Sequence, residues 1–284
     1  MTYRDAVNIL IDNGVENARF EVSLLICKLF SVSEASLPLM REQEFDDSIL
    51  APAVEKRAMG YPLQYILGEW GFFGLDFEVN ESCLSPRPDT ELLVEKAIEL
   101  LPQNAVFLEL CTGSGCIPVS ICNSRKDVKG VATELYPDTI STAKRNAARN
   151  GVEERISFVL ADVFDKKFFS EGKGRTLVPS EGFDAIVSNP PYIPTNDVFS
   201  LSREVRHEPF AALDGGADGL DFYREIITEY KKYLKPCGIM ILEIGYDQAE
   251  AMKKLAETAG FGCEIFKDLG GNDRVVILGG KGND

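Results

Sequence analysis

From residue 105 onward, the apolar positions of the chain come in short runs. Seven of these runs are predicted to be buried strands, at Ala105–Leu110, Gly130–Thr133, Ile156–Leu160, Asp184–Val187, Ile239–Ile244, Cys263–Phe266 and Arg274–Leu278. Stretches with helical spacing lie before and between them, at Glu91–Leu101, Pro137–Asn150, Leu220–Leu234 and Gln248–Ala259. This alternation predicts an α/β fold with a doubly wound, mostly parallel sheet of seven strands.

The connection between the last two predicted strands is short. Residues 268–272 read Asp-Leu-Gly-Gly-Asn, which is too few residues for the crossover helix that joins parallel neighbours. The final strand is therefore expected to run antiparallel to the others.

The first 67 residues have a different pattern, in which apolar residues such as Ala18, Val22 and Leu25 recur at helical spacing. We expect a small helical domain over residues 1–67, a β-hairpin linker over residues 68–85, and the sheet-containing domain over residues 86–284. No catalytic group of residues is found in the helical domain. It is interpreted either as a docking module for a large partner or as a cap that shields the main domain.

Arg87 stands between two prolines, just before the sequence Asp89-Thr90-Glu91. Asp and Thr are common residues at helix N-termini, so this sequence predicts a capped helix that starts at Glu91. An arginine held between prolines is either a clamp at a domain interface or a ligand contact.

Composition and charge restrict the kinds of partner that the protein is expected to bind. The formal net charge of the 284-residue chain is -15, and its basic residues are scattered, which argues against a partner bound mainly through its phosphates. The seven cysteines include no C-x-x-C pair, so reduced thiols and no metal site are expected. The N-terminus does not have the pattern of a signal peptide, and no apolar stretch is long enough to span a membrane. We therefore predict a cytoplasmic protein without direct nucleic-acid or membrane contact.

The first predicted strand runs directly into Thr112-Gly113-Ser114-Gly115, and the next two strands end in acids. Glycines allow a tight turn and close approach of the backbone to a ligand. Glu134 lies where a ribose-binding acid belongs, and Asp162, followed by Val163, can accept the exocyclic amine of adenine. Together these features predict a nucleoside-binding site. A nicotinamide dinucleotide is the competing ligand, although the turn lacks the third glycine of that fingerprint.

The fourth predicted strand ends at the corner Ser188-Asn189-Pro190-Pro191-Tyr192, which is suited to hold a planar NH2 group. The side-chain oxygen of Asn189 and the backbone carbonyl of Pro190 can each accept one N–H, and Tyr192 can stack on the planar group. Such an arrangement directs the nitrogen lone pair at an incoming methyl group. Together with the nucleoside site it suggests methyl transfer from S-adenosylmethionine to an amide or to the amine of a nucleic-acid base.

Motifs spread over most of the chain add to this interpretation. They are Pro62 to Gly68, Ser85 to Glu91, Thr112 to Gly115, Val187 to Tyr192, Glu208-Pro209 and Gly215 to Leu220. On these motifs the chain resembles the glutamine side-chain N-methyltransferases that modify peptide chain release factors. The short Asn-Pro-Pro-Tyr motif is shared with enzymes that methylate base amines, whereas the segments around Arg87 and Gly215 are typical of this family.

The resemblance implies a class I S-adenosylmethionine-dependent methyltransferase with a Rossmann-like fold, whose substrate is the glutamine in the Gly-Gly-Gln motif of a class 1 release factor. It implies that Thr112 to Gly115, Glu134, Asp162, Val163 and Asn189 surround the cofactor. It further implies that Asn189, Pro190, Pro191 and Tyr192, with Arg87, hold the glutamine carboxamide. A monomer whose helical domain contacts the release factor is expected.

Two positions depart from the family pattern. The turn usually begins with Asp-Leu-Gly, whereas this chain has Glu109-Leu110-Cys111, and the ribose-binding acid is Glu134 where Asp is commoner. A side chain at Cys111 is expected to narrow the cofactor pocket. The alternatives to the glutamine methyltransferase are a nucleic-acid amine methyltransferase and, less favoured, a non-catalytic scaffold that binds S-adenosylmethionine.

Overall fold

The computed structural model describes residues 1–280, which form two compact units. The first unit consists of residues 1–69 together with residues 201–208, and the second contains residues 70–200 and residues 209–280. The sequence had assigned residues 201–208 to the C-terminal domain. They belong with the first unit because Arg203 donates to the carbonyl of Asn13 and Glu204 pairs with Arg57.

The first unit is helical, as predicted. Its helices are α1 (Tyr3–Asp12), α2 (Ala18–Phe30), α3 (Asp47–Ala58) and α4 (Leu63–Leu67). A capping box formed by Thr2 and Asp5 starts α1. Residues Leu10, Val22, Leu25, Leu50 and Val54 are fully buried and make the core of the unit. Arg57 is also buried in this unit and forms ion pairs with both Glu21 and Glu204.

The predicted hairpin is present but shorter than the linker of residues 68–85. Strands β1 (Glu69–Phe72) and β2 (Leu75–Glu78) are joined by Phe73 and Gly74, whose φ angles of 50° and 73° match the positive values of a tight two-residue hairpin turn. Phe77 is fully buried, so the hairpin contributes to the core of the second unit.

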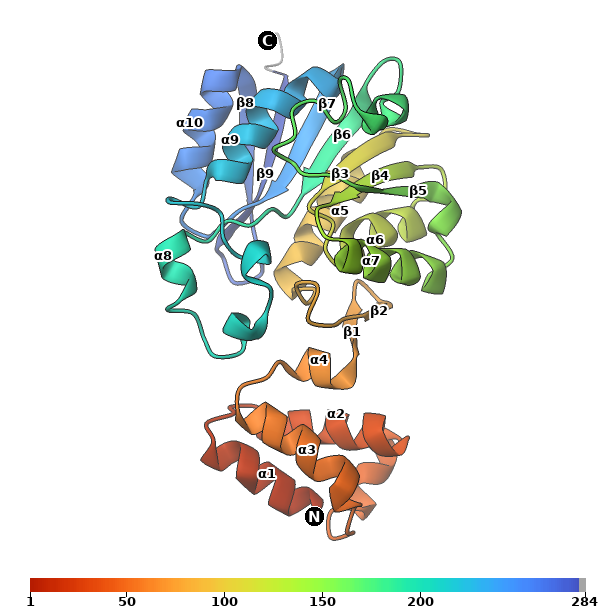
Figure 1. The fold of residues 1–284 in the computed structure, drawn as a ribbon, viewed down its shortest axis with the longest axis vertical. Helices are drawn as coiled ribbons and strands as arrows, with labels where there is room; N and C mark the ends of the chain where they lie inside the picture. The colour runs from red at the N-terminus through yellow and green to blue at the C-terminus, as the bar shows by residue number, and fades with distance from the viewer. Residues whose placement is uncertain (281–284) are drawn as a thin grey trace. The chain divides into compact units, whose positions relative to one another are not determined.

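The second unit is built on one sheet with the strand order β5-β4-β3-β6-β7-β9-β8 (Figure 1). Its strands are β3 (Val106–Leu110), β4 (Lys129–Glu134), β5 (Ile156–Leu160), β6 (Phe183–Ser188), β7 (Leu234–Glu243), β8 (Phe261–Lys267) and β9 (Asp273–Gly280). Strand β9 pairs antiparallel with both β7 and β8, and the other pairs in the sheet are parallel. The doubly wound seven-stranded sheet and its antiparallel final strand are thus confirmed.

Helices cover both faces of this sheet. One core combines the sheet with α5 (Glu91–Leu100), α6 (Cys116–Ser124) and α7 (Pro137–Arg149), and the other combines it with α9 (Asp221–Glu225) and α10 (Ala249–Ala259). A short helix, α8 (Thr195–Val198), lies in the long segment after β6. Among the described residues, no helix is long and apolar enough to cross a membrane.

The helix predicted over Leu220–Leu234 is not a single regular helix. The five-residue α9 continues as a π-helix over Ile226–Tyr230 and ends in a 3-10 turn over Lys231–Tyr233. Two buried tyrosines lie in this irregular helix: the hydroxyl of Tyr223 donates to the carbonyl of Glu243, and that of Tyr230 donates to the carbonyl of Val163. The irregular helix therefore ties the ends of β5 and β7 together.

The order of the strands reverses at β3, which lies between β4 and β6. In open α/β sheets, ligands bind in the crevice at the carboxyl ends of the strands on either side of such a switch point. Here those ends carry the glycine turn after β3, Glu134, Asp162 and the corner at Asn189.

Candidate active site

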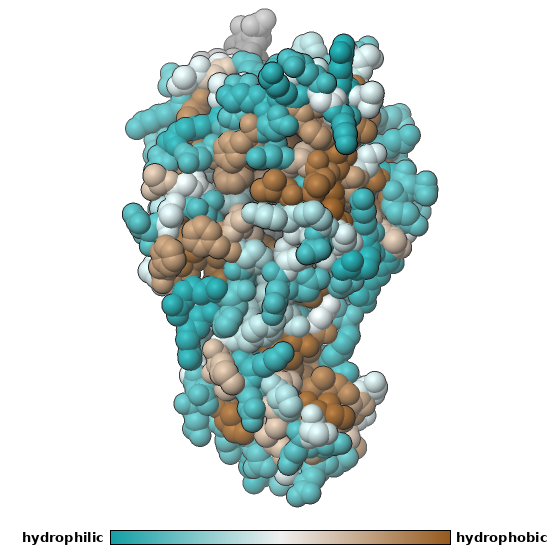
Figure 2. All heavy atoms as spheres, in the orientation of Figure 1, coloured by the Kyte–Doolittle hydropathy of each residue, from teal (hydrophilic) through white to brown (hydrophobic). Residues whose placement is uncertain are grey.

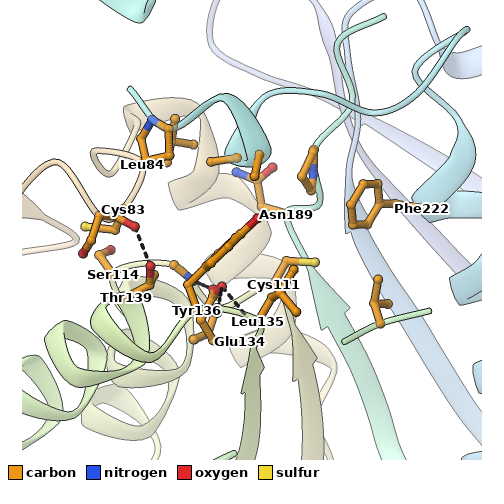
Figure 3. Close-up of a pocket in the computed structure, with 18 of the residues that line it drawn as sticks. Cys83, Leu84, Cys111, Ser114, Glu134, Leu135, Tyr136, Thr139, Asn189 and Phe222 are labelled. Atoms are coloured by element: carbon orange, nitrogen blue, oxygen red, sulfur yellow. Dashed lines mark hydrogen bonds between the residues drawn. The ribbon is translucent and has the colours of Figure 1, made fainter. Parts of the chain in front are cut away.

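A cavity of about 510 Å³ lies at this edge of the sheet, within the second unit (Figure 3). Most of the residues predicted to bind cofactor or substrate line it, namely Arg87, Thr112, Gly113, Ser114, Glu134, Asp162, Val163, Asn189 and Pro191. Gly115, Pro190 and Tyr192 are not among the lining residues. No group of three or more metal-ligating side chains occurs among residues 1–280.

The turn after β3 is held in an unusual backbone conformation. Cys111, Gly113 and Gly115 have φ angles of 60°, 56° and 79°. The buried carboxyl of Glu109 accepts a hydrogen bond from the hydroxyl of Thr112, and this contact stabilises the turn. A Cβ atom on Gly115 would lie 3.0 Å from the Cβ of Ala143, so this glycine is needed for packing on α7 rather than for lining the cavity.

The side chain at Cys111 projects into the cavity, as the departure from the family pattern led us to expect. Cys83 and Cys116 line the same cavity, so that three thiol-bearing residues surround it. Burial and the carboxylates of Glu134 and Glu109 raise the pKa of the Cys111 thiol.

Glu134 closes β4 and is the buried acid of the cavity. One of its carboxylate oxygens accepts from the backbone N–H groups of Leu135 and Tyr136, and the other accepts from the N–H of Gly113 at 3.0 Å. Burial raises the pKa of Glu134 in spite of these three hydrogen bonds. The contacts hold the longer acid in place beside the glycine turn and leave acceptor capacity for ribose hydroxyls.

The sequence analysis missed the apolar walls near Asp162. Leu135, Tyr136 and Phe164 line the cavity and remain 46%, 47% and 43% exposed, and Phe222 of α9 packs against Phe164 with ring centroids 4.9 Å apart. Hydrophobic residues also gather on the surface of this unit in front of the sheet (Figure 2). Apolar residues within two positions after each strand-ending acid were the available signal for Leu135 and Phe164, whereas nothing local pointed to Phe222.

Asn189 is oriented by a residue that the sequence analysis had assigned another role. Its Nδ2 donates to the hydroxyl oxygen of Thr90 at 3.2 Å. Thr90 was expected to cap α5, but its backbone is helical and its side chain makes no capping hydrogen bond, because a 3-10 turn over Pro88–Thr90 leads directly into the helix. The amide nitrogen of Asn189 therefore faces Thr90, and its oxygen is left for the cavity.

The glycine-rich segment of residues 215–219 packs against the backbone of the corner at residues 189–192. A Cβ atom on Gly215 would lie 2.7 Å from the Cα of Tyr192, and one on Gly219 would lie 2.3 Å from the carbonyl oxygen of Tyr192. The buried amide of Gln248 donates to the carbonyls of both Tyr192 and Gly219, at 3.0 and 3.1 Å. These close contacts explain why glycines are required at positions 215 and 219.

The groups around the cavity match a nucleoside-bearing cofactor. The buried Glu134 carboxylate suits vicinal hydroxyls, the apolar walls near Asp162 suit a flat base, and the tight turn allows backbone atoms to approach the ligand. Arg87 lines the same cavity. This position favours its interpretation as a ligand contact over that as a clamp at a domain interface.

Comparisons with known proteins agree with this geometry. Residues 2–68 match the family model described as the PrmC N-terminal domain, and residues 88–213 match that of the methyltransferase small domain. The chain is 41% identical to the release factor glutamine methyltransferase of Geobacter sulfurreducens, over 94% of this chain and 91% of that protein. It is 38% identical to the protein of the same name from Aquifex aeolicus, over 91% and 90% of the two chains.

A solved structure shows the same fold. The crystal structure of a methyltransferase from Pyrococcus furiosus superposes with a TM-score of 0.53 at 23% identity, and the match covers 74% of this chain and 90% of that one. The fold class and the family inferred from the motifs are both confirmed. The chain belongs to the release factor glutamine methyltransferase family.

Proposed function

We propose that this protein methylates the side-chain amide nitrogen of the glutamine in the Gly-Gly-Gln motif of class 1 peptide chain release factors, with S-adenosylmethionine as methyl donor. The observation that carries the proposal is the orientation of the Asn189 amide at the edge of the cavity. Its nitrogen donates a hydrogen bond to the Thr90 hydroxyl, so its oxygen is available to a substrate.

Thr112, Gly113, Ser114, Glu134, Asp162 and Val163 are the residues proposed to hold the cofactor, and Gly115, predicted with them, packs on α7 instead. Glu134 supplies the buried carboxylate for the ribose, and Leu135 and Phe164 supply apolar surface for the base. When bound, S-adenosylmethionine supplies an electrophilic methyl group: its S–CH3 bond breaks as the new N–C bond forms, and S-adenosylhomocysteine is the leaving group.

The corner at residues 189–192 is proposed to orient the substrate amide. The lone pair of an amide nitrogen is delocalised, so the nitrogen reacts only if it is held in line with the methyl group. The Asn189 oxygen and the Pro190 carbonyl each accept one N–H of the glutamine, while Pro191 and Tyr192 confine its planar group. The nitrogen loses one proton to water after methylation, so a strong base is not required.

The charge distribution supports a protein substrate. A net charge of -15 opposes phosphate-rich partners. We propose that the enzyme acts as a monomer in the cytoplasm and that the helical unit contacts the release factor.

The test is incubation of purified release factor with this protein and S-adenosylmethionine, followed by mass spectrometry of the Gly-Gly-Gln peptide. We expect a mass increase of one methyl group on the glutamine side chain. Asn189→Ala should lower turnover about 100-fold or more, since two aligned hydrogen-bonding groups are reduced to one, while the Kd of S-adenosylmethionine changes little.

Asn123→Ala is the matched control, because the Asn123 side chain is exposed, donates to the carbonyl of Asn150 and does not line the cavity. It should keep wild-type turnover. Methyl transfer to RNA or DNA but not to release factor would contradict the proposed substrate, and full turnover of Asn189→Ala would contradict the proposed mechanism.

A further inference from the structure

The side-chain amide of Asn189 has a donor end and an acceptor end, and only one orientation serves the proposed function. With the oxygen toward the cavity, Asn189 accepts an N–H of the substrate amide. In the flipped orientation its NH2 group would meet the NH2 group of the substrate, and two donors would face each other. A group that fixes the orientation of Asn189 therefore affects turnover directly.

The end of β7 places such a group beside Asn189. Ser188 pairs with Leu242 in the parallel register of β6 and β7, so the next residues along the two strands, Asn189 and Glu243, are neighbours. Glu243 is only 2% exposed, and its Oε2 atom has no hydrogen-bond partner among the described residues. Its backbone carbonyl is held by the Tyr223 hydroxyl at 2.7 Å.

The carboxyl of Glu243 faces the two residues that already contact each other. Burial raises the pKa of Glu243 to about 7, while hydrogen bonding with the side chains of Thr90 and Asn189 and the charge of Arg274 act in the opposite direction. Arg274 itself forms ion pairs with Asp268 and Asp89, at 3.1 and 3.2 Å, rather than with Glu243.

A carboxyl buried without an ion pair costs stability. Leu242 and Ile244, which flank Glu243 in the chain, are buried in the hydrophobic core, and replacing buried charged groups by apolar residues of similar volume is often neutral or stabilising. The presence of a carboxyl there therefore points to a task at the adjacent corner.

We propose that Glu243 and Thr90 are positioning residues that hold the Asn189 amide with its oxygen toward the substrate nitrogen. Ionised Glu243, the form that becomes populated as pH rises through its raised pKa, can only accept hydrogen bonds. In this form the Thr90 hydroxyl donates to Glu243, and its oxygen is left to accept from Asn189 Nδ2. The Glu243 carboxylate thus sets the direction of the hydrogen bonds from Asn189 to Thr90 and from Thr90 to Glu243. A flipped Asn189 would place its side-chain oxygen against the acceptor oxygens of Thr90 and Glu243.

The inference rests on the proposed function, and three variants test it. Thr90→Val keeps the shape of the side chain and removes the hydroxyl, Thr90→Ser restores the hydroxyl, and Glu243→Gln keeps the volume but adds a donor. Ser120→Ala is the matched control, because Ser120 lies on α6, its buried hydroxyl has no hydrogen-bond partner in residues 1–280, and it does not line the cavity.

We expect Thr90→Val and Glu243→Gln each to lower kcat on release factor about tenfold or more, with the Kd of S-adenosylmethionine unchanged within about twofold. Thr90→Ser should recover most of the kcat lost in Thr90→Val. The double variant should be little worse than the more severe single variant, because both changes break the same chain.

A second measurement does not depend on turnover. The side-chain amide protons of Asn189, identified in NMR spectra by their loss in Asn189→Ala, should exchange with solvent faster in Thr90→Val and Glu243→Gln than in the wild type. Wild-type kcat or unchanged exchange in both variants would overturn the inference, as would a parallel loss of cofactor affinity. A wild-type enzyme inactive on release factor would instead overturn the proposed function, and amide exchange would still decide the role of Glu243.

Discussion

Replacing Glu243 by glutamine is expected to change how the stability of the second unit depends on pH. Burial raises the pKa of this carboxyl from 4.5 to about 7 in the folded protein. Between these two values the folded state holds a proton that the unfolded state has lost, so the stability contribution is complete below pH 4.5 and is lost as pH rises toward 7. The full loss is about 3 kcal/mol, at 1.36 kcal/mol for each pKa unit.

The other groups that face Glu243 do not produce this signal. Arg274 keeps its charge, because the raised pKa of its guanidinium lies far above this range, and it forms an ion pair with Asp89. Burial raises the pKa of Tyr192 to about 12 and also raises the pKa values of Tyr223 and Cys116, so these three groups stay neutral from pH 5 to pH 8.

The assay is urea unfolding at several pH values from 5 to 8, followed by fluorescence of Trp70, the single tryptophan, which lies in β1. The free energy of unfolding of Glu243→Gln, relative to the wild type, should rise by about 2 to 3 kcal/mol over this range. Only this slope is predicted, so a constant offset from the new amide does not matter. Glu257→Gln, at an exposed position on α10, is the control and should follow the wild type. Parallel curves for Glu243→Gln and the wild type would refute the reasoning.

Three further outcomes follow from the contacts described above. Gly219→Ala should lower the free energy of unfolding by at least about 2 kcal/mol and turnover more than tenfold, because its Cβ would lie 2.3 Å from the Tyr192 carbonyl oxygen. The control Gly271→Ala has a similar φ but open space around it, so it should lose about 1 kcal/mol and keep its turnover. Equal effects of the two variants in activity assays would contradict this. Glu134→Gln should weaken S-adenosylmethionine binding about tenfold or more in calorimetry, and an unchanged Kd would exclude a ribose contact. Arg57→Leu should destabilise the helical unit by about 3 kcal/mol, because it leaves Glu21 without its buried partner; unaltered hydrogen exchange in α2 and α3 would disprove this.

The architecture of the second unit could be predicted because it depends on local patterns. The inner strands β3 and β6 are buried on both faces and so appear as short apolar runs. The brief connection at residues 268–272 allowed only an antiparallel final strand. The acids at strand ends were also visible, since topology alone brings the carboxyl ends of neighbouring strands together.

What the sequence did not reveal depends on contacts between distant residues. Thr90 has the residue type of a helix cap, yet its hydroxyl contacts Asn189, which lies 99 residues away in the chain. Residues 201–208 carry no sign in their own pattern that Glu204 pairs with Arg57. Phe222 reaches the cavity from a helix whose π-turn no local propensity indicates. Pairing partners of this kind are set by the assembled fold.

The three cysteines around the cavity are nucleophiles that lie close to the proposed site of methyl transfer. A thiolate is a soft nucleophile that alkylating agents attack readily, whereas a protonated thiol is not. Burial raises the pKa of Cys116 to about 12, so only about one molecule in 100,000 carries its thiolate at pH 7. At Cys111, burial and the neighbouring carboxylates Glu134 and Glu109 raise the pKa further in the same direction. Burial, assisted by the acids that hold the cofactor turn, thus keeps the nearby sulfur atoms protonated, so that they do not compete with the substrate amide for the methyl group and the enzyme does not alkylate its own active site.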